Sequence, residues 1–286
     1  MKTYIVEGGI GKCVAFSALV DKLAERDGGE IQIHTPWHEV FGGNPKVKWV
    51  FDGNSVPMTD PRILESDEIV YCEPYKSNFV KGVEHLIESY CKLLGIEYTP
   101  DMRPKLYTDH AKAGADEVLQ NAEINGQYML VQFTGGQPAM NAYAGQQYMS
   151  GDPGRNYPYY LAQEVINKLK ASNPDVTIIN YSLPNEPSYE NTVRLEASFP
   201  VWHEIVKKAE GFVAIDSSLN HLATAAGCKG VVIWGSTRWS QFGYDDNINV
   251  SFHQNENWDE SKFNPNDPRN IMVDPEVITN LYNGRK

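Results

Sequence analysis

Asp216, Ser217, Ser218 and His221 lie just beyond a short apolar run at residues 212–215. Such a run is typical of a strand buried on both faces of a parallel sheet. Small polar side chains cap a helix start, and the free amides and partial positive charge there attract phosphate. His221 would stand on the first turn, where its side chain could donate to the same anion. An ordinary helix cap with a hydrogen-bonded histidine fits the pattern equally well, so both interpretations stay open here.

The elements that must position these residues follow from the spacing of apolar side chains. Small and apolar residues recur at helical intervals from Leu219 to Ala226, Gly227 ends that helix, and a second apolar run covers residues 231–234. The result is a strand, a helix and a second strand. Ligands of open α/β sheets bind beyond the carboxyl ends of the strands. The segment therefore predicts a ligand site at one edge of a parallel sheet.

A glycine loop at residues 7–13 follows a predicted strand at 3–6 and precedes a predicted helix at 12–26. It resembles the phosphate-binding loop of partition-type ATPases, in which a Ser or Thr hydroxyl after the lysine holds Mg²⁺. Here that position is Cys13, a poor Mg²⁺ ligand, and the expected first lysine is Glu7, which would oppose phosphate. A deviant P-loop ATPase is therefore the less favoured interpretation.

Strand and helix signals alternate along the whole chain, and the alternation restarts after residue 122. Further strands are expected at 31–34, 47–51, 68–71, 128–133 and 176–181, and further helices at 83–94, 111–122, 159–169, 201–208 and 275–282. We expect an α/β fold of two Rossmann-like domains facing across a cleft, residues 1–122 and 123–286. The last helix is expected to pack back on the N-terminal domain, and residues 139–156 to form a loop near the cleft.

Composition narrows the class of protein. The 286 residues are 41% hydrophobic and 22% charged, which is an ordinary globular mixture. A net charge of −12 argues against broad binding to nucleic acid or anionic membranes. No apolar run reaches the ~18 residues of a membrane span, and the four cysteines lack metal-ligand spacing. We expect a cytoplasmic protein with reduced thiols, no bound metal and no cofactor.

The segment 212–237 resembles the C-terminal signature of the heptosyltransferase-like glycosyltransferases, glycosyltransferase family 9. In that family a strand runs into Asp-Thr/Ser-Gly/Ser-x-x-His-Leu-Ala-x-Ala-x-Gly, and the next strand ends in Gly-Pro/Ser-Thr. The matching residues are Asp216, Ser217, Ser218, His221, Leu222, Ala223, Ala226, Gly227, Gly235 and Thr237. Looser matches are the glycine loop, Gly43-Asn44-Pro45-x-Val47, Arg103-Pro104-x-Leu106 and Arg155-x-Tyr157-Pro158. The resemblance implies the two-domain GT-B fold.

The resemblance also implies which residues meet the substrates. The C-terminal domain would bind the nucleotide sugar through Thr134, Gly135, Arg155, Glu186, Asp216, Ser217, Ser218, Leu219 and His221. The N-terminal domain would receive the acceptor beside Gly8, Gly9 and Gly11. The family's loop Asp, the implied base, is Lys12 in this chain. Three explanations stay open. Lys12 binds phosphate while Glu7 takes the proton of the acceptor, or the acceptor is acidic enough to react with little help from a base. Alternatively, the protein has lost transferase activity and only binds its ligand.

The implied activity is metal-independent, inverting transfer of a sugar from a nucleotide-diphosphate sugar to an acceptor hydroxyl. The acceptor would be a saccharide or glycolipid, with a nucleobase as the alternative. The rival interpretation is a degenerate, non-catalytic nucleotide- or sugar-binding protein of the same fold. The oligomeric state is not indicated by the sequence.

Overall fold

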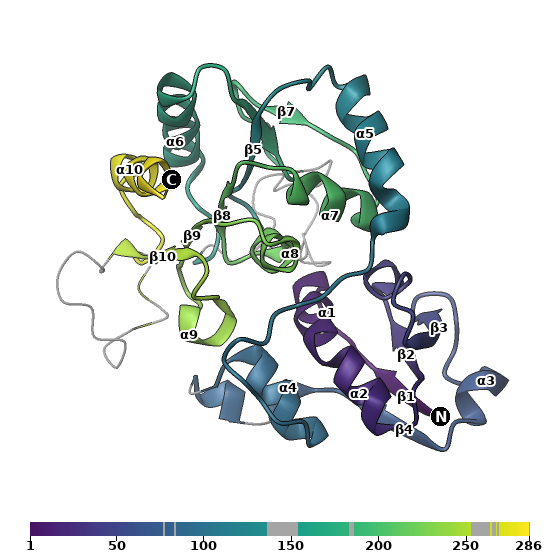
Figure 1. Cartoon of the computed structure of the whole chain (residues 1–286). Coiled ribbons are helices and arrows are strands. Elements are labelled where there is room, and N and C mark those ends of the chain that lie inside the picture. The colour runs from purple at the N-terminus through teal and green to yellow at the C-terminus, as the bar shows by residue number, and fades with distance from the viewer. Residues whose placement is uncertain are drawn as a thin grey trace, which may run out of the picture.

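The computed structural model describes residues 1–76, 78–82, 84–135, 154–182, 186–252, 264, 267 and 269–285. It contains two parallel sheets, one of four strands and one of six, each flanked by helices (Figure 1). Of the expected loop at 139–156, only residues 154–156 belong to the described ranges. The segment 183–185, next to Glu186, lies outside them as well.

The N-terminal sheet is built from four parallel strands in the order β3-β2-β1-β4. Their bounds are β1 Lys2–Ile5, β2 Ile31–Thr35, β3 Val47–Asp52 and β4 Glu68–Tyr71. The chain moves outward from β1 to β3 and then crosses to the other side of β1 for β4. The strand order thus reverses between β1 and β4, which pair in register up to Ile5 opposite Tyr71.

Three helices cover one face of this sheet: α1 Ile10–Phe16, α2 Val20–Arg26 and α4 Leu86–Leu94. The single helix expected from 12 to 26 is divided by a 3₁₀ turn at Ser17–Leu19. Tyr4 and Ile33 of the sheet share one apolar cluster with Phe16 of α1 and Tyr90 of α4. The short α3 Pro61–Leu64 completes the helices of this half, whereas α5 Lys112–Asn121 packs on the second half.

The second sheet is also parallel throughout, in the order β10-β9-β8-β5-β6-β7. Its strands are β5 Tyr128–Gln132, β6 Thr177–Asn180, β7 Val193–Arg194, β8 Phe212–Ile215, β9 Gly230–Ile233 and β10 Ile248–Val250. The chain moves one way from β5 to β7 and the other way from β8 to β10. The strand order therefore reverses between β5 and β8.

Both faces of the second sheet are buried, which explains the continuous apolar runs. Alternate residues point to opposite faces: Met129 and Val131 pack toward α6 Tyr159–Ser172, and Leu130 belongs with the cluster of α7 Phe199–Lys207 and α8 Ser218–Ala226. The terminal helix α10 Pro275–Gly284 packs on α6 and β9. The expectation that it returns to the N-terminal half is therefore wrong: its buried Ile278 and Tyr282 complete the second sheet's core.

The two halves are joined by more than the connecting chain. Helix α1 packs against α8 across the boundary between the halves, as the centre of Figure 1 shows. The apolar cluster that contains α1 continues into α7 and α8. Across the described residues, none of the helices combines the length and apolar composition needed to cross a bilayer. The domain boundary at residue 122 stays a prediction.

Candidate functional site

The points at which the strand order reverses define where a ligand would meet each sheet. In open α/β sheets, ligands bind beyond the carboxyl ends of the strands at this position. In the N-terminal sheet it lies between the glycine loop after β1 and the segment around Glu73 after β4. In the second sheet it lies between Thr134 and Gly135 after β5 and Asp216 and Ser217 after β8. These are the regions that the sequence motifs indicate.

The two reversal points come together through Gly11 of α1 and His221 of α8. A Cβ atom on Gly11 would lie only 2.7 Å from Cδ2 of His221 and 3.2 Å from its Nε2, so the imidazole lies against bare backbone. The ring is 4% exposed, and its Nδ1 is 2.8 Å from the hydroxyl of Tyr244. Burial lowers the pKa of His221 to about 4, so the ring is neutral at pH 7. His221 can therefore offer a hydrogen bond but not a positive charge.

Lys12 turns toward the end of β4 rather than into open solvent. Its ammonium lies 3.1 Å and 3.3 Å from the two carboxylate oxygens of Glu73 and 4.4 Å above the ring of Tyr75. Lys12 is 8% exposed, and its stem covers Gly8, whose φ of +103° suits glycine. The motifs did not indicate Glu73. Its only signal is its place two residues beyond a predicted strand.

A second ion pair forms at the end of β8. Arg155 Nη2 donates to the backbone oxygen of Asp216 at 2.7 Å and lies 3.3 Å from Oδ2 of its carboxylate. Asp216 is 3% exposed. Within the part of the chain that the structure describes, the buried Nε of Arg155 has no hydrogen-bond partner. The guanidinium therefore keeps a donor that a ligand could use.

Charged residues of both ion pairs, one from each half, influence the pKa of Tyr75. Burial raises the pKa of Tyr75, the carboxylates of Glu73 and Asp216 raise it further, and the guanidinium of Arg155 opposes them. Groups that influence one phenol in this way share a small region. Charges from both halves of the molecule therefore gather at the meeting point of the two sheets.

The start of α8 is held by a residue that the motif does not contain. Oε1 of Gln132, the last residue of β5, accepts from the Ser217 hydroxyl at 2.6 Å and from the Leu219 amide at 3.1 Å. Two of the predicted phosphate donors are thus already engaged within the protein, which corrects the expectation that both are free for a ligand. Ser218 faces Tyr181: burial raises the pKa of that phenol to about 12, and Ser218 opposes the rise.

Replacing Gln132 by leucine should therefore destabilise the protein by about 2 kcal/mol, because two buried donors lose their acceptor. Urea denaturation would measure this difference. Gln120→Leu, at an exposed position of α5, is the matched control and should stay within about 0.5 kcal/mol of wild type. Equal stability of the two variants would contradict a capping role for Gln132.

The other predicted residues follow the carboxyl ends of strands β1, β5 and β6. Gly135 lies against Ser217, since a Cβ there would be 3.3 Å from that of Ser217. Thr134 precedes it at the end of β5, and Gly9 precedes the first turn of α1. Glu186 is 8% exposed, and its backbone oxygen accepts from Arg194 at 3.2 Å, beyond β6.

Glu7 does not face Lys12. Its carboxylate accepts from the hydroxyl of Tyr71 on β4, and both residues are exposed. That hydrogen bond is the main cause that raises the pKa of Tyr71 to about 12. Glu7, the predicted base, therefore lies beside a phenol near the surface, while Glu73 occupies the position beside the lysine.

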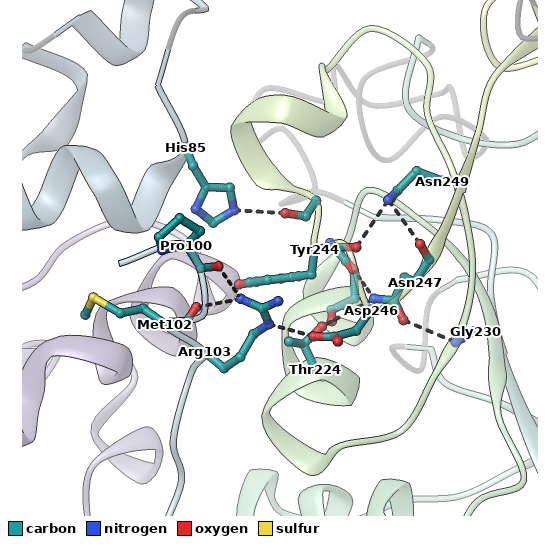
Figure 2. A network of polar contacts seen from close by, with 12 residues as sticks. His85, Pro100, Met102, Arg103, Thr224, Gly230, Tyr244, Asp246, Asn247 and Asn249 are labelled. Atoms are coloured by element: carbon teal, nitrogen blue, oxygen red, sulfur yellow. Dashed lines mark hydrogen bonds and ion pairs between the residues drawn. The ribbon is translucent and has the colours of Figure 1, made fainter. Parts of the chain in front are cut away.

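The loop after β9 connects the site to the N-terminal half (Figure 2). Nε2 of His85, at the start of α4, donates to the Gly243 oxygen at 2.9 Å, and Nε of Arg103 donates to Asp246 at 2.6 Å. Tyr244 lies between these contacts, with its ring 5.4 Å from that of His85 and its hydroxyl on His221. The contacts that hold the halves together thus also support the candidate site.

The sequence indicates no role for Tyr244, because none of the recognised motifs contains it. The described ranges contain no group of three His, Cys, Asp or Glu side chains arranged to hold a metal ion. The groups available to bind a ligand here are therefore side-chain cations, hydroxyls, an imidazole and helix amides.

Comparison with protein-family models and with curated protein sequences gives no match. Solved structures do match. The glycosyl transferase family 9 structure from Veillonella parvula DSM 2008 aligns with a TM-score of 0.68 and 8% identity, over 98% of this chain and 95% of the other. E. coli ADP-heptose lps heptosyltransferase II gives 0.66 and 12%, over 99% and 98%. The iron-containing dodecameric glycosyltransferase TibC from enterotoxigenic E. coli gives 0.64 and 16%, over 99% and 74%. The chain therefore has the GT-B fold of the family 9 heptosyltransferase structures.

Proposed function

We propose that this protein is a glycosyltransferase that moves a sugar from a nucleotide-diphosphate sugar to an acceptor hydroxyl. The observation that carries the proposal is the meeting of the two strand-order reversal points, through Gly11 and His221. Each sheet brings a helix start and an ion pair to this place. A reaction between two substrates needs both to be held at one point, and the fold is one that performs such transfers in its structural relatives.

The chemistry assigns different tasks to the two halves. As the bond from the anomeric carbon to the diphosphate breaks, negative charge develops on the leaving group, and preorganised donors and cations stabilise it. Arg155 supplies the cation for this task, with an Nε that no described residue engages, and Asp216 fixes its orientation. Neutral His221 and Ser218 add hydrogen bonds. A hydroxyl that attacks opposite the diphosphate in a single displacement inverts the anomeric carbon.

The rival proposal is a protein that binds a nucleotide or sugar without turnover. Lys12 is the specific feature that favours it, because this residue stands where the similar family has its loop carboxylate. The ATPase interpretation loses support, because Cys13 is fully buried and its thiol lies 3.3 Å from the Thr35 hydroxyl. An Mg²⁺ ion on a bound nucleotide could not use this thiol without unpacking the core.

The decisive experiment measures release of nucleoside diphosphate from ADP-, UDP- and GDP-sugars, with and without EDTA. ADP-heptose is the first donor to test, since one structural relative is named for it. Turnover that survives EDTA and gives the opposite anomeric configuration supports the full proposal. Binding without turnover of any donor supports the rival, and Mg²⁺-dependent ATP hydrolysis alone would overturn both.

Binding should also appear as stabilisation. A nucleoside diphosphate at 100 times its Kd adds about 2.7 kcal/mol to the free energy of unfolding. Arg155→Gln should weaken that affinity roughly ten- to hundredfold, because a charged donor to the diphosphate is lost. The variant also leaves buried Asp216 unpaired, so the readout is the ADP-induced shift and not the stability of the free protein. Arg62→Gln is the control and should keep the full ADP-induced shift. Arg62 lies on α3 and pairs with Asp60, which precedes that helix.

A further inference from the structure

Glu73 is a fixed carboxylate at the N-terminal reversal point to which no step of the proposed reaction has yet been assigned. Its side chain is 21% exposed, so it is accessible but partly shielded from water. One oxygen accepts from the backbone amide of Tyr75 at 3.0 Å, and both oxygens lie within 3.3 Å of the Lys12 ammonium. These contacts fix the position and direction of the carboxylate without a substrate.

Glu7 and Glu73 compete for the same role because they occupy equivalent places in the sheet. Strands β1 and β4 pair in register up to Ile5 and Tyr71, and each glutamate lies two residues beyond that pair. Glu7 is exposed and is bonded to a phenol. Glu73 is joined to Lys12, close to the helix start that meets His221. Of the two glutamates, only Glu73 raises the pKa of Tyr75, as Asp216 does, while Arg155 lowers it.

The lysine holds the carboxylate in one orientation, since its ammonium lies within 3.3 Å of both oxygens. The ring of Tyr75 beneath the ammonium holds the cation in place. A carboxylate that is oriented and partly shielded from water is suited to accept a proton from a hydroxyl nucleophile, as the general base does in inverting glycoside hydrolysis.

We propose that Glu73 is the catalytic base of the transfer and that Lys12 is the residue that positions it, an inference that rests on the proposed glycosyltransferase function. The acceptor O–H bond breaks and its proton passes to a Glu73 oxygen. The acceptor oxygen forms a bond to the anomeric carbon, and the electron pair of the breaking carbon–oxygen bond leaves with the diphosphate beside Arg155. Lys12 takes no part in the proton transfer.

The test compares Glu73→Gln with wild type in full-length protein, using donor turnover and ADP binding. Glu73→Gln should lower kcat by about 10²- to 10⁴-fold, the usual contribution of a general base, with ADP affinity changed less than about threefold. Its pH–rate profile should lose the acid limb. Lys12→Met should also lower kcat, because the carboxylate is no longer held in place, and Lys12→Arg, which keeps the ion pair, should restore part of it. A purely structural ion pair would change stability but not kcat.

Glu68→Gln is the matched control, because Glu68 begins β4, the strand that Glu73 follows, and pairs with Lys2 at 2.9 Å. It should retain wild-type turnover. Active wild type with an equally active Glu73→Gln variant would overturn the assignment of Glu73 and leave the transferase proposal standing. A larger loss in Glu7→Gln than in Glu73→Gln would also overturn it. Wild type that binds ADP but transfers from no donor would overturn the transferase proposal, and the base with it.

Discussion

Replacing Gly11 by valine should lower the free energy of unfolding by about 3 kcal/mol, measured by urea denaturation. The reason is the contact between the halves: even a single Cβ would lie 2.7 Å from the His221 ring. The ring cannot simply swing away, because it is 4% exposed and Tyr244 holds its Nδ1. Valine adds two methyl groups to that clash. Either α1 must move away from α8 or the imidazole must leave its site.

Gly9→Ala is the matched control in the same loop. Gly9 has an ordinary φ of −73°, and nothing lies within 4 Å of the place where its Cβ would be. Its stability should stay within about 0.5 kcal/mol of wild type. Adding His221→Ala to Gly11→Val should recover part of the loss, because the smaller side chain makes room, and a double-mutant cycle measures that coupling. Strict additivity of the two changes would contradict direct packing of Gly11 on His221.

The local part of the site could be predicted from the sequence. The strand at 212–215, the helix start at Ser218 and the stop at Gly227 each follow from neighbouring residues, and the structure confirms them. Gly11 is expected to lie beside the acceptor. That the His221 ring packs against it could not be predicted, because the contact joins residues 210 positions apart in two different halves.

The residues that sequence reasoning missed are those placed by topology. Glu73 reaches Lys12 only because β4 crosses to the far side of β1, and a pattern of apolar residues does not give strand order. Gln132 caps α8 because β5 and β8 are neighbours. In both cases the sequence predicts the strand but not which strand lies beside it. The assignment of the base to Glu7 followed from nearness in sequence rather than nearness in space.

Short elements were missed for a different reason. Strands β7 and β10 have two and three residues, and helices α3 and α9 Trp239–Phe242 have four each, too few for a periodic pattern. Helix α3 depends on a local device, since Pro61 begins it and the Asp60 side chain accepts from the Arg62 amide. Helix α10 was recognised, but its partner was not. Amphipathic spacing indicates that one face is buried without indicating what buries it.

Three buried or partly buried histidines should make the protein lose stability between pH 6.5 and about 4. Burial lowers the pKa of His85, His203 and His221 to about 4 each, from 6.5. In this window the unfolded chain binds protons that the native state does not, so the free energy of unfolding rises with pH. The contribution of each neutral histidine is complete above pH 6.5 and is lost as the pH falls toward 4.

The free energy of unfolding should rise steeply with pH in this window. Each proton taken up on unfolding contributes about 1.4 kcal/mol per pH unit, so three histidines give about 4 kcal/mol per unit near pH 5. Urea titrations between pH 5 and 7 measure it. Asp27 does not contribute in this range, since its pKa is lowered to about 2, mainly by its hydrogen bond to Arg26. A slope below one proton would contradict the three neutral histidines.

Single substitutions show how much each histidine contributes to the change of the free energy of unfolding with pH. The hydrogen bonds of His85 require its neutral form, because Nε2 donates to Gly243 while Nδ1 accepts from the Ile87 amide at 3.2 Å. Protonation of Nδ1 would therefore break the cap of α4 as well as place a charge between the halves. His85→Gln should reduce the slope by about 1.4 kcal/mol per pH unit. Because His85 and His221 both contact Tyr244, acid that charges them should weaken the contact between the halves before it unfolds either sheet.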